Sequence, residues 1–476
     1  MHPTHSAAVL LASLLTSPAF STTPKYHPSS FYPSAIITRD VAIIGGGSSG
    51  THTAISLKDA NKSVIVVEIK NQLGGHTETY TDPATGITYD YGVLVYQNES
   101  IVLDYFARFD IPLAPPQFAG NEADYDISTG LAVNISAPSI EDLGAGVRKY
   151  AAFLAQYPKL ESGMFLPSPV PAGLTIPFGD LVNKLGLEAV VQTMFNTNQG
   201  IGDILGVPVV ENARVNGLGL IQQLAASSLV STARRNNSEL YGKAQAELLD
   251  ADSLLLSSQV VRSVRGVNGV DLVVKAPDGV KLVRAKKLLI TIPPRLNLLA
   301  RFGLRKQERE VFGKLVDAGY YAALVRNTGV PDDLFIYNRA SDTPYNLPAM
   351  PGVYHIQPTA IPGVKAIYYG SQRSNATYPL SDDFVREAIA SIKRLQTANP
   401  DNFEATEPDF VVYTSHAPFY MQASPEDIQA SIYDEMNALQ GLRSTYWSGA
   451  TFRAPDSSAL WKFNKEIVFP ILMEGL

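Results

Sequence analysis

A glycine pattern between two apolar runs constrains the fold of this chain more than any other feature. Gly45, Gly47 and Gly50 follow the apolar run 41–44 with G-x-G-x-x-G spacing. The first glycine permits a tight turn, the second lets backbone approach a pyrophosphate, and the third lets a helix pack closely on the strand. We expect that helix over 48–60, with its N-terminal N–H groups directed at the anion. The pattern therefore predicts a dinucleotide-binding βαβ unit.

The second apolar run ends in an acidic residue where this kind of unit contacts a ribose. Residues 64–67 predict a parallel strand, and Glu68 follows it directly. A carboxylate at this position accepts hydrogen bonds from the adenosine ribose and disfavours a 2′-phosphate. Ser49, in the first turn of the expected helix, belongs to the same predicted phosphate site. An ordinary glycine-rich turn is the alternative, but it does not explain why strand, helix, strand and Glu68 are in register.

The residues after this carboxylate distinguish a flavin from a nicotinamide cofactor. The sequence Leu-Gly-Gly-His-Thr at 73–77 resembles the flavin amine oxidase superfamily, where a Gly-Gly-Arg motif passes along the FAD diphosphate. It resembles more closely the fungal β-cyclopiazonate dehydrogenase family, whose members carry a Gly-Gly-His-Thr version. The segment Tyr-Asp-Tyr-Gly at 89–92 is also similar to flavin-dependent polyenoic fatty acid isomerases. The resemblance implies FAD as the cofactor, with Gly74, Gly75 and His76 beside it.

His76 departs from the superfamily pattern, because the matching residue there is an arginine. The departure removes a permanent positive charge from the neighbourhood of the diphosphate. His76 can donate a hydrogen bond to the cofactor or carry it covalently, and the alternative is a turn residue in a solvated loop. A histidyl-linked flavin is open to His52 as well, whereas a cysteinyl link is excluded because the chain contains no cysteine.

Two later segments complete the resemblance. The strand expected at 258–264 matches the superfamily's second flavin segment, which implies that Val261 contacts adenine through its backbone, with Val260 as the one-residue alternative. The C-terminal segment 445–461 implies a strand, a turn and a helix whose N-terminus faces the isoalloxazine and stabilises negative charge on the reduced ring. Gly449 and Ser458 are the cofactor residues expected there. Asp456 and Ser457 are the two candidates for the helix N-cap.

These segments predict an α/β fold of two discontinuous domains with an α+β substrate part. The Rossmann-like FAD-binding domain is expected to comprise 38–109, 238–296 and 426–476. The substrate domain is expected to comprise 110–237 and 297–425, because strand-like runs alternate with turns there and predict a mostly antiparallel sheet plus helices.

The N-terminus predicts entry into the secretory pathway. Residues 7–15 are apolar and precede a small-residue cleavage site, so 1–21 is interpreted as a signal peptide, with a disordered tail as the alternative. Residues 22–37 follow as a Ser-, Thr- and Pro-rich linker. The apolar run is too short to span a bilayer, and no stable membrane span is expected. We therefore predict a protein that is secreted or lies in the secretory-pathway lumen. The glycosylation sequons begin at Asn61, Asn98, Asn134, Asn236 and Asn375.

Composition and the histidines limit the chemistry. A net charge of −7 without a basic stripe argues against nucleic acid as a partner. No metal site, hydrolytic triad or carboxylate pair stands out, since the flavin itself would carry the hard step. His355 and His416 are the weak candidates for a general base. Residues 320–324 lack the lysine that many amine oxidases of the superfamily place near the flavin.

The function expected from the resemblance is FAD-dependent oxidation in secondary metabolism. The enzyme would remove hydride from a small hydrophobic substrate, terpenoid or prenylated, with oxidative cyclisation as one option. A double-bond isomerase, a flavin amine oxidase and a non-catalytic flavin-binding protein are the alternatives.

Overall fold

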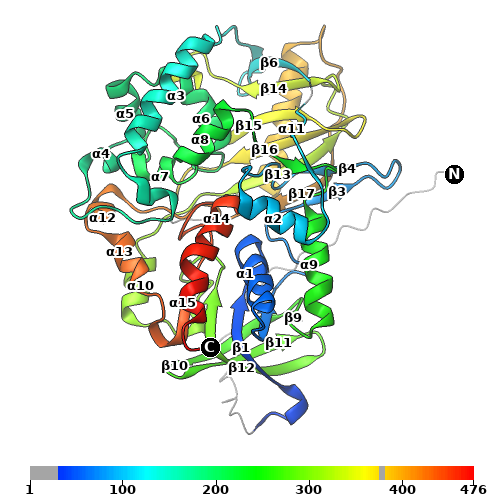
Figure 1. Ribbon diagram of the computed structural model, residues 1–476. Helices are drawn as coiled ribbons and strands as arrows, with labels where there is room; N and C mark the ends of the chain where they lie inside the picture. Colours follow the sequence, from blue (N-terminus) through cyan, green and yellow to red (C-terminus); the bar gives the residue numbers. More distant parts are fainter. Residues whose placement is uncertain (1–29, 119, 375–380) are drawn as a thin grey trace, which may run out of the picture.

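The chain folds around two large sheets, one above the other in Figure 1. The structure is a computed structural model that describes residues 30–118, 120–374 and 381–476. The predicted signal peptide, the linker up to residue 29 and the Asn375 sequon lie outside the described residues. Secretion and glycosylation therefore stay predictions.

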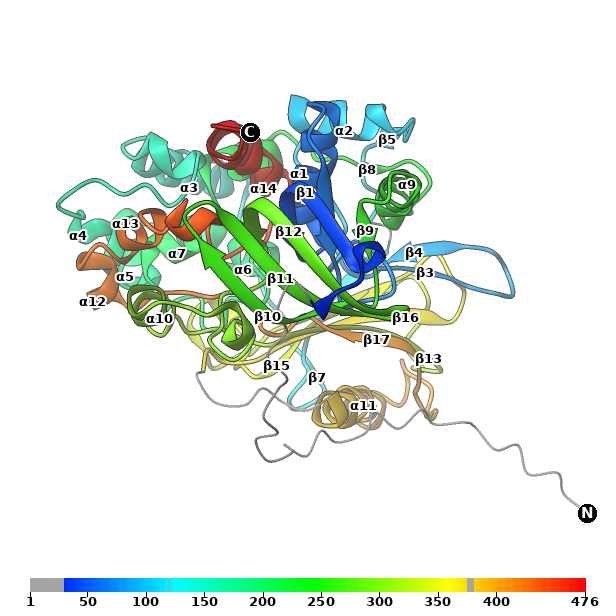
Figure 2. The same ribbon diagram turned by 90° about the horizontal axis from the view of Figure 1, so that it is seen from below.

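The lower sheet, here called the nucleotide sheet, has seven strands in the order β10-β11-β12-β1-β2-β9, with β18 paired to β12. Strands β9, β2, β1, β12 and β18 are parallel, whereas β10, β11 and β12 form an antiparallel meander that lies side by side with β1 in Figure 2. The central strands are buried on both faces, which is why they are continuously apolar. Its strands are β1 (Ile36–Ile44), β2 (Val64–Val67), β9 (Leu254–Leu255), β10 (Gln259–Gly266), β11 (Gly269–Ala276), β12 (Gly279–Ile290) and β18 (Thr445–Trp447).

The upper sheet, here called the substrate sheet, has seven strands in the order β17-β13-β16-β15-β14-β6-β7. All its pairings are antiparallel except that of β14 with β6. Its strands are β6 (Asn121–Asp126), β7 (Leu131–Ala132), β13 (Tyr320–Arg326), β14 (Leu334–Asn338), β15 (Gly352–Pro358), β16 (Val364–Gly370) and β17 (Asp409–Ser415). The α/β class with a mostly antiparallel second sheet is confirmed.

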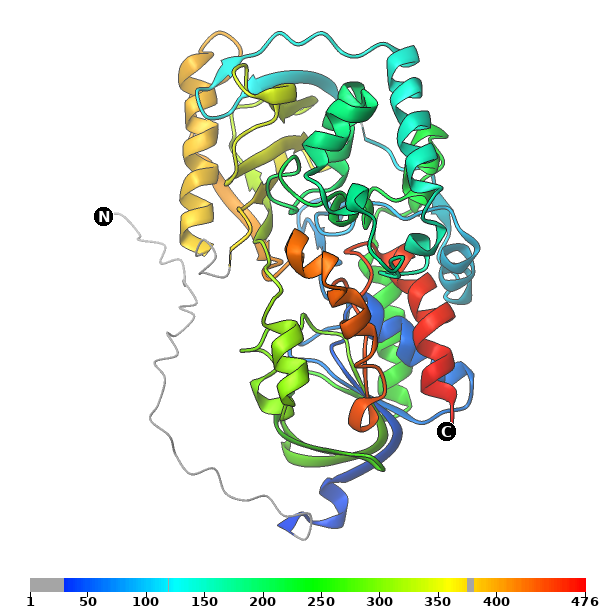
Figure 3. The ribbon, with the colours of Figure 1, turned by 90° about the vertical axis from the view of Figure 1, so that its left-hand side faces the viewer.

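The substrate sheet separates two hydrophobic cores. In β13, Tyr320, Ala322 and Leu324 face the main core, whereas Tyr321 and Ala323 face a smaller one. Helix α11 (Ser381–Ala398) closes the smaller core with Phe384, Ala388, Ile392 and Leu395, which recur at helical spacing. Figure 3 shows this gold helix along the substrate sheet, on the side away from the cyan α3 (Ile140–Leu154). The main core therefore lies on the other face of the substrate sheet and includes residues of the nucleotide sheet.

Short helices surround the main core and join the two sheets. The remaining helices are α1 (Ser48–Asp59), α2 (Ser100–Arg108), α4 (Ala172–Thr175), α5 (Phe178–Leu185), α6 (Val191–Thr197), α7 (Val209–Ala213), α8 (Leu218–Ala225), α9 (Ser238–Asp250), α10 (Lys306–Phe312), α12 (Pro425–Gln429), α13 (Ile432–Asn437), α14 (Ser457–Phe463) and α15 (Phe469–Met473). Short strand pairs are β3 (Thr79–Thr81) with β4 (Thr88–Asp90), and β5 (Leu113–Ala114) with β8 (Ser231–Thr232).

One predicted boundary needs correction. Strand β1 begins at Ile36, inside the predicted linker 22–37, because Ile36 and Ile37 pair with Leu282 and Val283 of β12. The long strand β12 extends the parallel pairing toward the N-terminus, so residues that look like linker join the sheet. The other domain boundaries stay predictions.

A buried ion pair fixes helix α10 against the meander. The Arg265 guanidinium donates to both carboxylate oxygens of Glu308, at 2.8 and 2.6 Å, and both side chains are fully buried. Glu308 also accepts from the backbone N–H of Arg305 at 2.7 Å. The pair costs desolvation energy, which the two parallel hydrogen bonds offset.

We expect Arg265→Met to lower the free energy of unfolding by about 3–5 kcal/mol, because it leaves Glu308 charged and unpaired in the core. The double variant Arg265→Met/Glu308→Leu should recover most of the loss. Urea unfolding measures both. The control is Arg234→Met, which breaks an exposed pair with Glu239 and should lower the free energy of unfolding much less. A single variant as stable as the parent chain would contradict this account.

Candidate functional site

Four glycines bring backbone segments into contact at the end of β1. Gly45 has a φ of +100°, and a Cβ on Gly50 would lie 1.9 Å from the Gly45 carbonyl oxygen. Gly75 has a φ of +61°, and a Cβ there would lie 2.8 Å from the Gly47 Cα. The Gly74-Gly75 turn is therefore packed directly on the glycine-rich turn. A Cβ on Gly47 itself would lie 3.6 Å from the Gly75 Cα, which is an ordinary contact distance and fits a position kept open for a phosphate.

Two helix N-termini meet at this turn. The Ser49 and Ser448 hydroxyls lie 2.8 Å apart, and Ser448 donates to Asn464 at 2.5 Å. The Ser48 hydroxyl donates to that of Ser457 at 2.9 Å, so the starts of α1 and α14 face one another. The first N–H groups of α1 and the serine hydroxyls beside them suit an anion. The turn before α14 also approaches β12, because Gly449 has a φ of +105° and a Cβ there would lie 2.8 Å from the Thr291 carbonyl oxygen.

The structure distinguishes the two predicted caps of α14. The Asp456 carboxylate accepts from the Ala459 N–H at 3.0 Å and is therefore the N-cap. The Ser458 hydroxyl accepts from the Gln97 N–H at 2.9 Å and is almost fully buried. Ser458 can therefore serve a cofactor through its backbone rather than its hydroxyl.

The predicted ribose acceptor lies at the expected edge of the nucleotide sheet. Glu68 follows β2, and its carboxylate accepts from the Gly46 N–H at 2.6 Å and the Lys70 N–H at 2.7 Å. The backbone then links Glu68 to the start of the meander, since its carbonyl accepts from the Ser258 N–H at 2.8 Å. Val261 lies at a bulge in the edge strand β10, where the register shifts between Val260 and Arg262. An extended, irregular edge beside Glu68 suits backbone contacts with an adenine.

The histidines divide into two groups. His76 is exposed next to the Gly74-Gly75 turn, and its ring stacks on His416 with 4.2 Å between centroids and 16° between planes. His52, which lies on α1, is instead buried between the rings of Tyr105 and Trp461. His76 therefore faces the predicted cofactor path, whereas His52 packs in the protein interior.

The two candidate bases occupy different surroundings. His416 is buried beyond the end of β17, where its backbone N–H donates to the Tyr320 carbonyl. Its ring Nε2 has no hydrogen-bond partner in the described chain. Burial, and then the neighbouring His76 ring, hold the pKa of His416 well below its usual range. His355 lies in β15 against Tyr368, and its Nδ1 is 3.2 Å from the Gln199 amide nitrogen. Only His416 contacts the cofactor-side turn through His76.

Sequence reasoning missed an aromatic wall around His416, here called the aromatic cluster. Its rings are Tyr320, Tyr354, Tyr368 and Phe419. The Tyr320 ring lies 4.9 Å from Phe419 and 5.7 Å from His416 between centroids. Tyr320 donates to the Gln199 side chain at 2.9 Å, which fixes its hydroxyl. Only the sheet register assembles these rings, although the aromatic residues at 320–321 were visible in the sequence.

A second group that the sequence did not reveal holds the C-terminal turn. Arg214, fully buried after α7, forms an ion pair with Glu211 at 2.7 Å. Its guanidinium also donates to the carbonyls of Ala450 at 2.7 Å, Thr451 at 2.8 Å and Arg453 at 3.1 Å. The residues that follow Gly449 are thereby fixed to the helical part of the substrate region.

These features fit an extended dinucleotide that runs from Glu68 past the glycine turns to His76. Among the described residues, no cluster of three or more His, Asp or Glu side chains suits a metal ion. Within the same ranges, no helix has the length and apolar character needed to cross a bilayer.

Comparisons with known proteins agree with this geometry. A family model described as an NAD(P)-binding Rossmann-like domain matches residues 43–109. The FAD-dependent oxidoreductase oblC of Cochliobolus heterostrophus is 47% identical over 475 residues, covering 99% of this chain and 98% of that protein. The β-cyclopiazonate dehydrogenase of Aspergillus oryzae is 34% identical over 438 residues, covering 91% of this chain and 92% of that protein.

A solved structure shares the fold at lower identity. The fatty acid isomerase from P. acnes, which produces CLA, superposes with a TM-score of 0.75 at 17% identity, covering 91% of this chain and 98% of that one. Cyclohexylamine oxidase from Brevibacterium oxydans IH-35A superposes with a TM-score of 0.62 at 16% identity. The match covers 92% of this chain and 99% of that one. The comparisons confirm the predicted flavoenzyme relationship and FAD as the cofactor.

We expect Glu68→Gln to weaken FAD binding about ten-fold or more, because loss of a charged hydrogen bond costs roughly 1.5–3 kcal/mol. Equilibrium titration of the apoprotein with FAD measures the effect. The matched control, Glu122→Gln, alters an exposed carboxylate on the distant strand β6 and should bind FAD like the parent. Unchanged affinity in Glu68→Gln would show that the ribose assignment is wrong.

Proposed function

Because the chain belongs to the fungal FAD-dependent oxidoreductases that include β-cyclopiazonate dehydrogenase, we propose that it oxidises a small hydrophobic molecule of secondary metabolism. The proposed substrate is terpenoid or prenylated, and oxidative cyclisation is one outcome of the reaction. The observation that carries the proposal is the position of His416. Its buried ring contacts both the exposed His76 on the cofactor side and Tyr320 of the aromatic cluster.

The bound flavin supplies hydride acceptance, and the protein positions the reactants. In this proposal the Glu68 carboxylate binds the ribose, while the N-terminus of α1 binds the diphosphate. The aromatic cluster excludes water and packs against an apolar substrate.

His416 is the proposed proton acceptor. Burial keeps the ring neutral at pH 7, and Nε2 has no hydrogen-bond partner in the described chain, so this atom is the proposed acceptor of the proton that the substrate loses. The same lowered pKa makes the ring a weaker base than a free imidazole. His76 positions this ring through the stack rather than by a hydrogen bond. His355 lies farther along the same sheet and is the control position.

The alternatives differ in what they require of the site. A flavin amine oxidase is disfavoured by the aromatic residues and the missing lysine at the start of β13. A double-bond isomerase uses the same fold, and the likeness to the fatty acid isomerase concerns the fold alone. A non-catalytic flavin protein would need neither the exposed His76 nor the free Nε2 beside it.

Purified protein should be yellow, with an absorption band near ~450 nm from oxidised flavin. Anaerobic addition of a terpenoid or prenylated substrate should bleach this band, and readmission of air should restore it with consumption of oxygen. Turnover without bleaching or oxygen uptake would select the isomerase. Colourless protein that cannot be reconstituted with FAD would refute every flavin function.

We expect His416→Gln to retain its flavin band but to reduce the rate of substrate-dependent bleaching by about 10²-fold, a typical contribution of a general base. Stopped-flow absorption under anaerobic conditions measures the rate. The matched variant His355→Gln should change it much less, because that ring does not contact His76. An equal loss of bleaching rate in both variants would show that His416 is not the base.

A further inference from the structure

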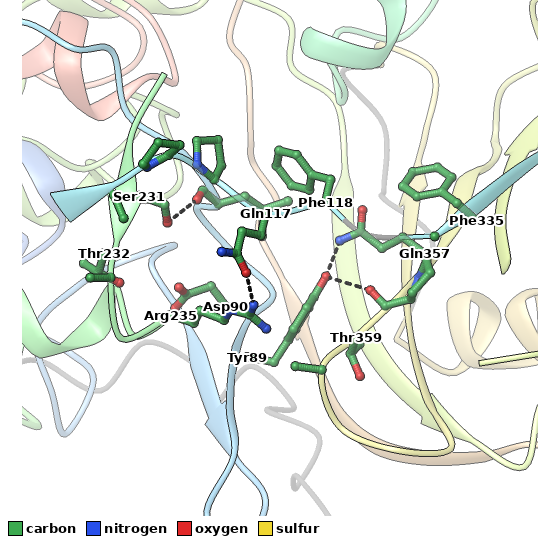
Figure 4. Close-up of a pocket in the computed structure, with 18 of the residues that line it drawn as sticks. Tyr89, Asp90, Gln117, Phe118, Ser231, Thr232, Arg235, Phe335, Gln357 and Thr359 are labelled. Carbon is green, nitrogen blue, oxygen red and sulfur yellow. Dashed lines mark hydrogen bonds between the residues drawn. The ribbon is translucent and has the colours of Figure 1, made fainter. Parts of the chain in front are cut away.

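A cavity of about 440 Å³ opens beside the aromatic cluster, outside the flavin path described above. Figure 4 shows it between β4, the β5–β8 pair and the ends of β14 and β15. Small-molecule sites in proteins typically have volumes of roughly 300–1,000 Å³, so this cavity is large enough for a ligand of several rings. Here it is called the outer cavity.

Part of the wall of the outer cavity is apolar. Pro115, Pro116 and Phe118 form one side, and Phe335 of β14 contributes a second ring. The Phe118 side chain is 62% exposed although it lines a concave surface. An exposed aromatic ring gains roughly 1.5–3 kcal/mol when a partner buries it. These walls therefore favour a ligand with an apolar body.

One cation lies among the residues that line the outer cavity, and it has no carboxylate partner in the described chain. The Arg235 guanidinium donates only to the neutral amide oxygen of Gln117. Its neighbour Arg234 instead pairs with Glu239 at 2.6 Å. Arg235 also has a φ of +52°, a conformation that costs free energy in a residue other than glycine. A guanidinium held in this way suits a carboxylate, an enolate or a sulfonate.

In the described chain, none of the three acidic residues that line the outer cavity forms an ion pair with this cation. Asp90 is buried, where it accepts from Thr79 and from the Asn237 N–H, and burial raises its pKa to about 6. Asp332 and Asp333 lie on the rim. Asp332 accepts from the Gly363 N–H at 3.0 Å, and Asp333 accepts from the Asn121 amide at 2.7 Å.

The inner wall of the outer cavity is connected to the aromatic cluster. The Gln357 amide donates to the Tyr89 hydroxyl and, at 3.3 Å, to the Tyr368 hydroxyl. The Tyr368 ring is stacked on Tyr320 with 6.2 Å between centroids and 17° between planes. The Tyr89–Gln357 hydrogen bond, drawn in Figure 4, therefore separates the outer cavity from the rings around His416.

We propose that the outer cavity binds an apolar molecule with an anionic oxygen, which Arg235 recognises while the apolar body packs on Phe118 and Phe335. Binding of such a molecule stands independently of catalysis. Its identification as the enzyme's substrate rests on the proposed function. In that case Arg235 holds one end of the substrate, and the Tyr89–Gln357 hydrogen bond must open for the other end to reach the aromatic cluster.

The test compares two probes of the same aromatic body in the FAD-loaded protein. Isothermal titration calorimetry should detect 2-naphthalenesulfonate in one saturable site and neutral 2-naphthalenemethanol more weakly. Arg235→Gln should weaken the sulfonate about ten-fold, the effect of losing a charged hydrogen bond, and should leave the neutral probe unchanged. Arg234→Gln is the matched control and should bind both probes like the parent. Phe118→Ala should weaken both probes.

Each outcome decides the proposal. No saturable sulfonate binding, an equal loss for both probes in Arg235→Gln, or an equal loss in Arg234→Gln would overturn it. The flavin band near ~450 nm verifies that each variant is folded and loaded. Sulfonate binding in a protein that oxidises no substrate would support the cavity and count against the proposed function, so the two failures are distinguishable.

Discussion

The direct backbone contact between Gly47 and Gly75 is the constraint on which the rest of the site depends. A Cβ on Gly75 would lie 2.8 Å from the Gly47 Cα, so a side chain there would push the two turns apart. The contact places His76 beside the glycine-rich turn, although the two belong to different loops. From there the His76 ring reaches His416 of the substrate region. One glycine contact thus positions both the phosphate end and the reactive end of the site.

A second constraint holds the C-terminal part of the same site. Arg214 and Glu211 are fully buried, and an unpaired charge in that place would be strongly destabilising. The pair is satisfied by the carbonyls of Ala450, Thr451 and Arg453 and by the Tyr433 hydroxyl. Since these carbonyls belong to the turn after Gly449, the desolvation of the ion pair is offset by bonds that also define the turn. The ion pair therefore ties the substrate helices to the cofactor turn.

Local chemistry explains which parts of the fold the sequence could predict. The helix expected at 48–60 is α1 (Ser48–Asp59), and the strand expected at 64–67 is β2, because glycine spacing and buried parallel strands leave strong local signals. The His76–His416 stack has no such signal. It depends on the antiparallel register that pairs Tyr321 of β13 with Ser415 of β17. The outer cavity likewise depends on pairing of the proline-rich 112–116 segment with β8, which leaves no periodic pattern.

The charges of the molecule are distributed so that the centre of the site is neutral. Burial raises the pKa of Tyr320 and Tyr368 well above the usual value, and burial lowers the pKa of His355 to about 3. With His416 also neutral, the aromatic cluster carries no formal charge at pH 7. A neutral, apolar surrounding suits an apolar substrate, because burial of a charged group there would be costly. The unpaired guanidinium of Arg235 lies outside this region, where an anionic group can bind without entering it. If both proposals hold, the anionic group is recognised at one place and the reaction occurs at another.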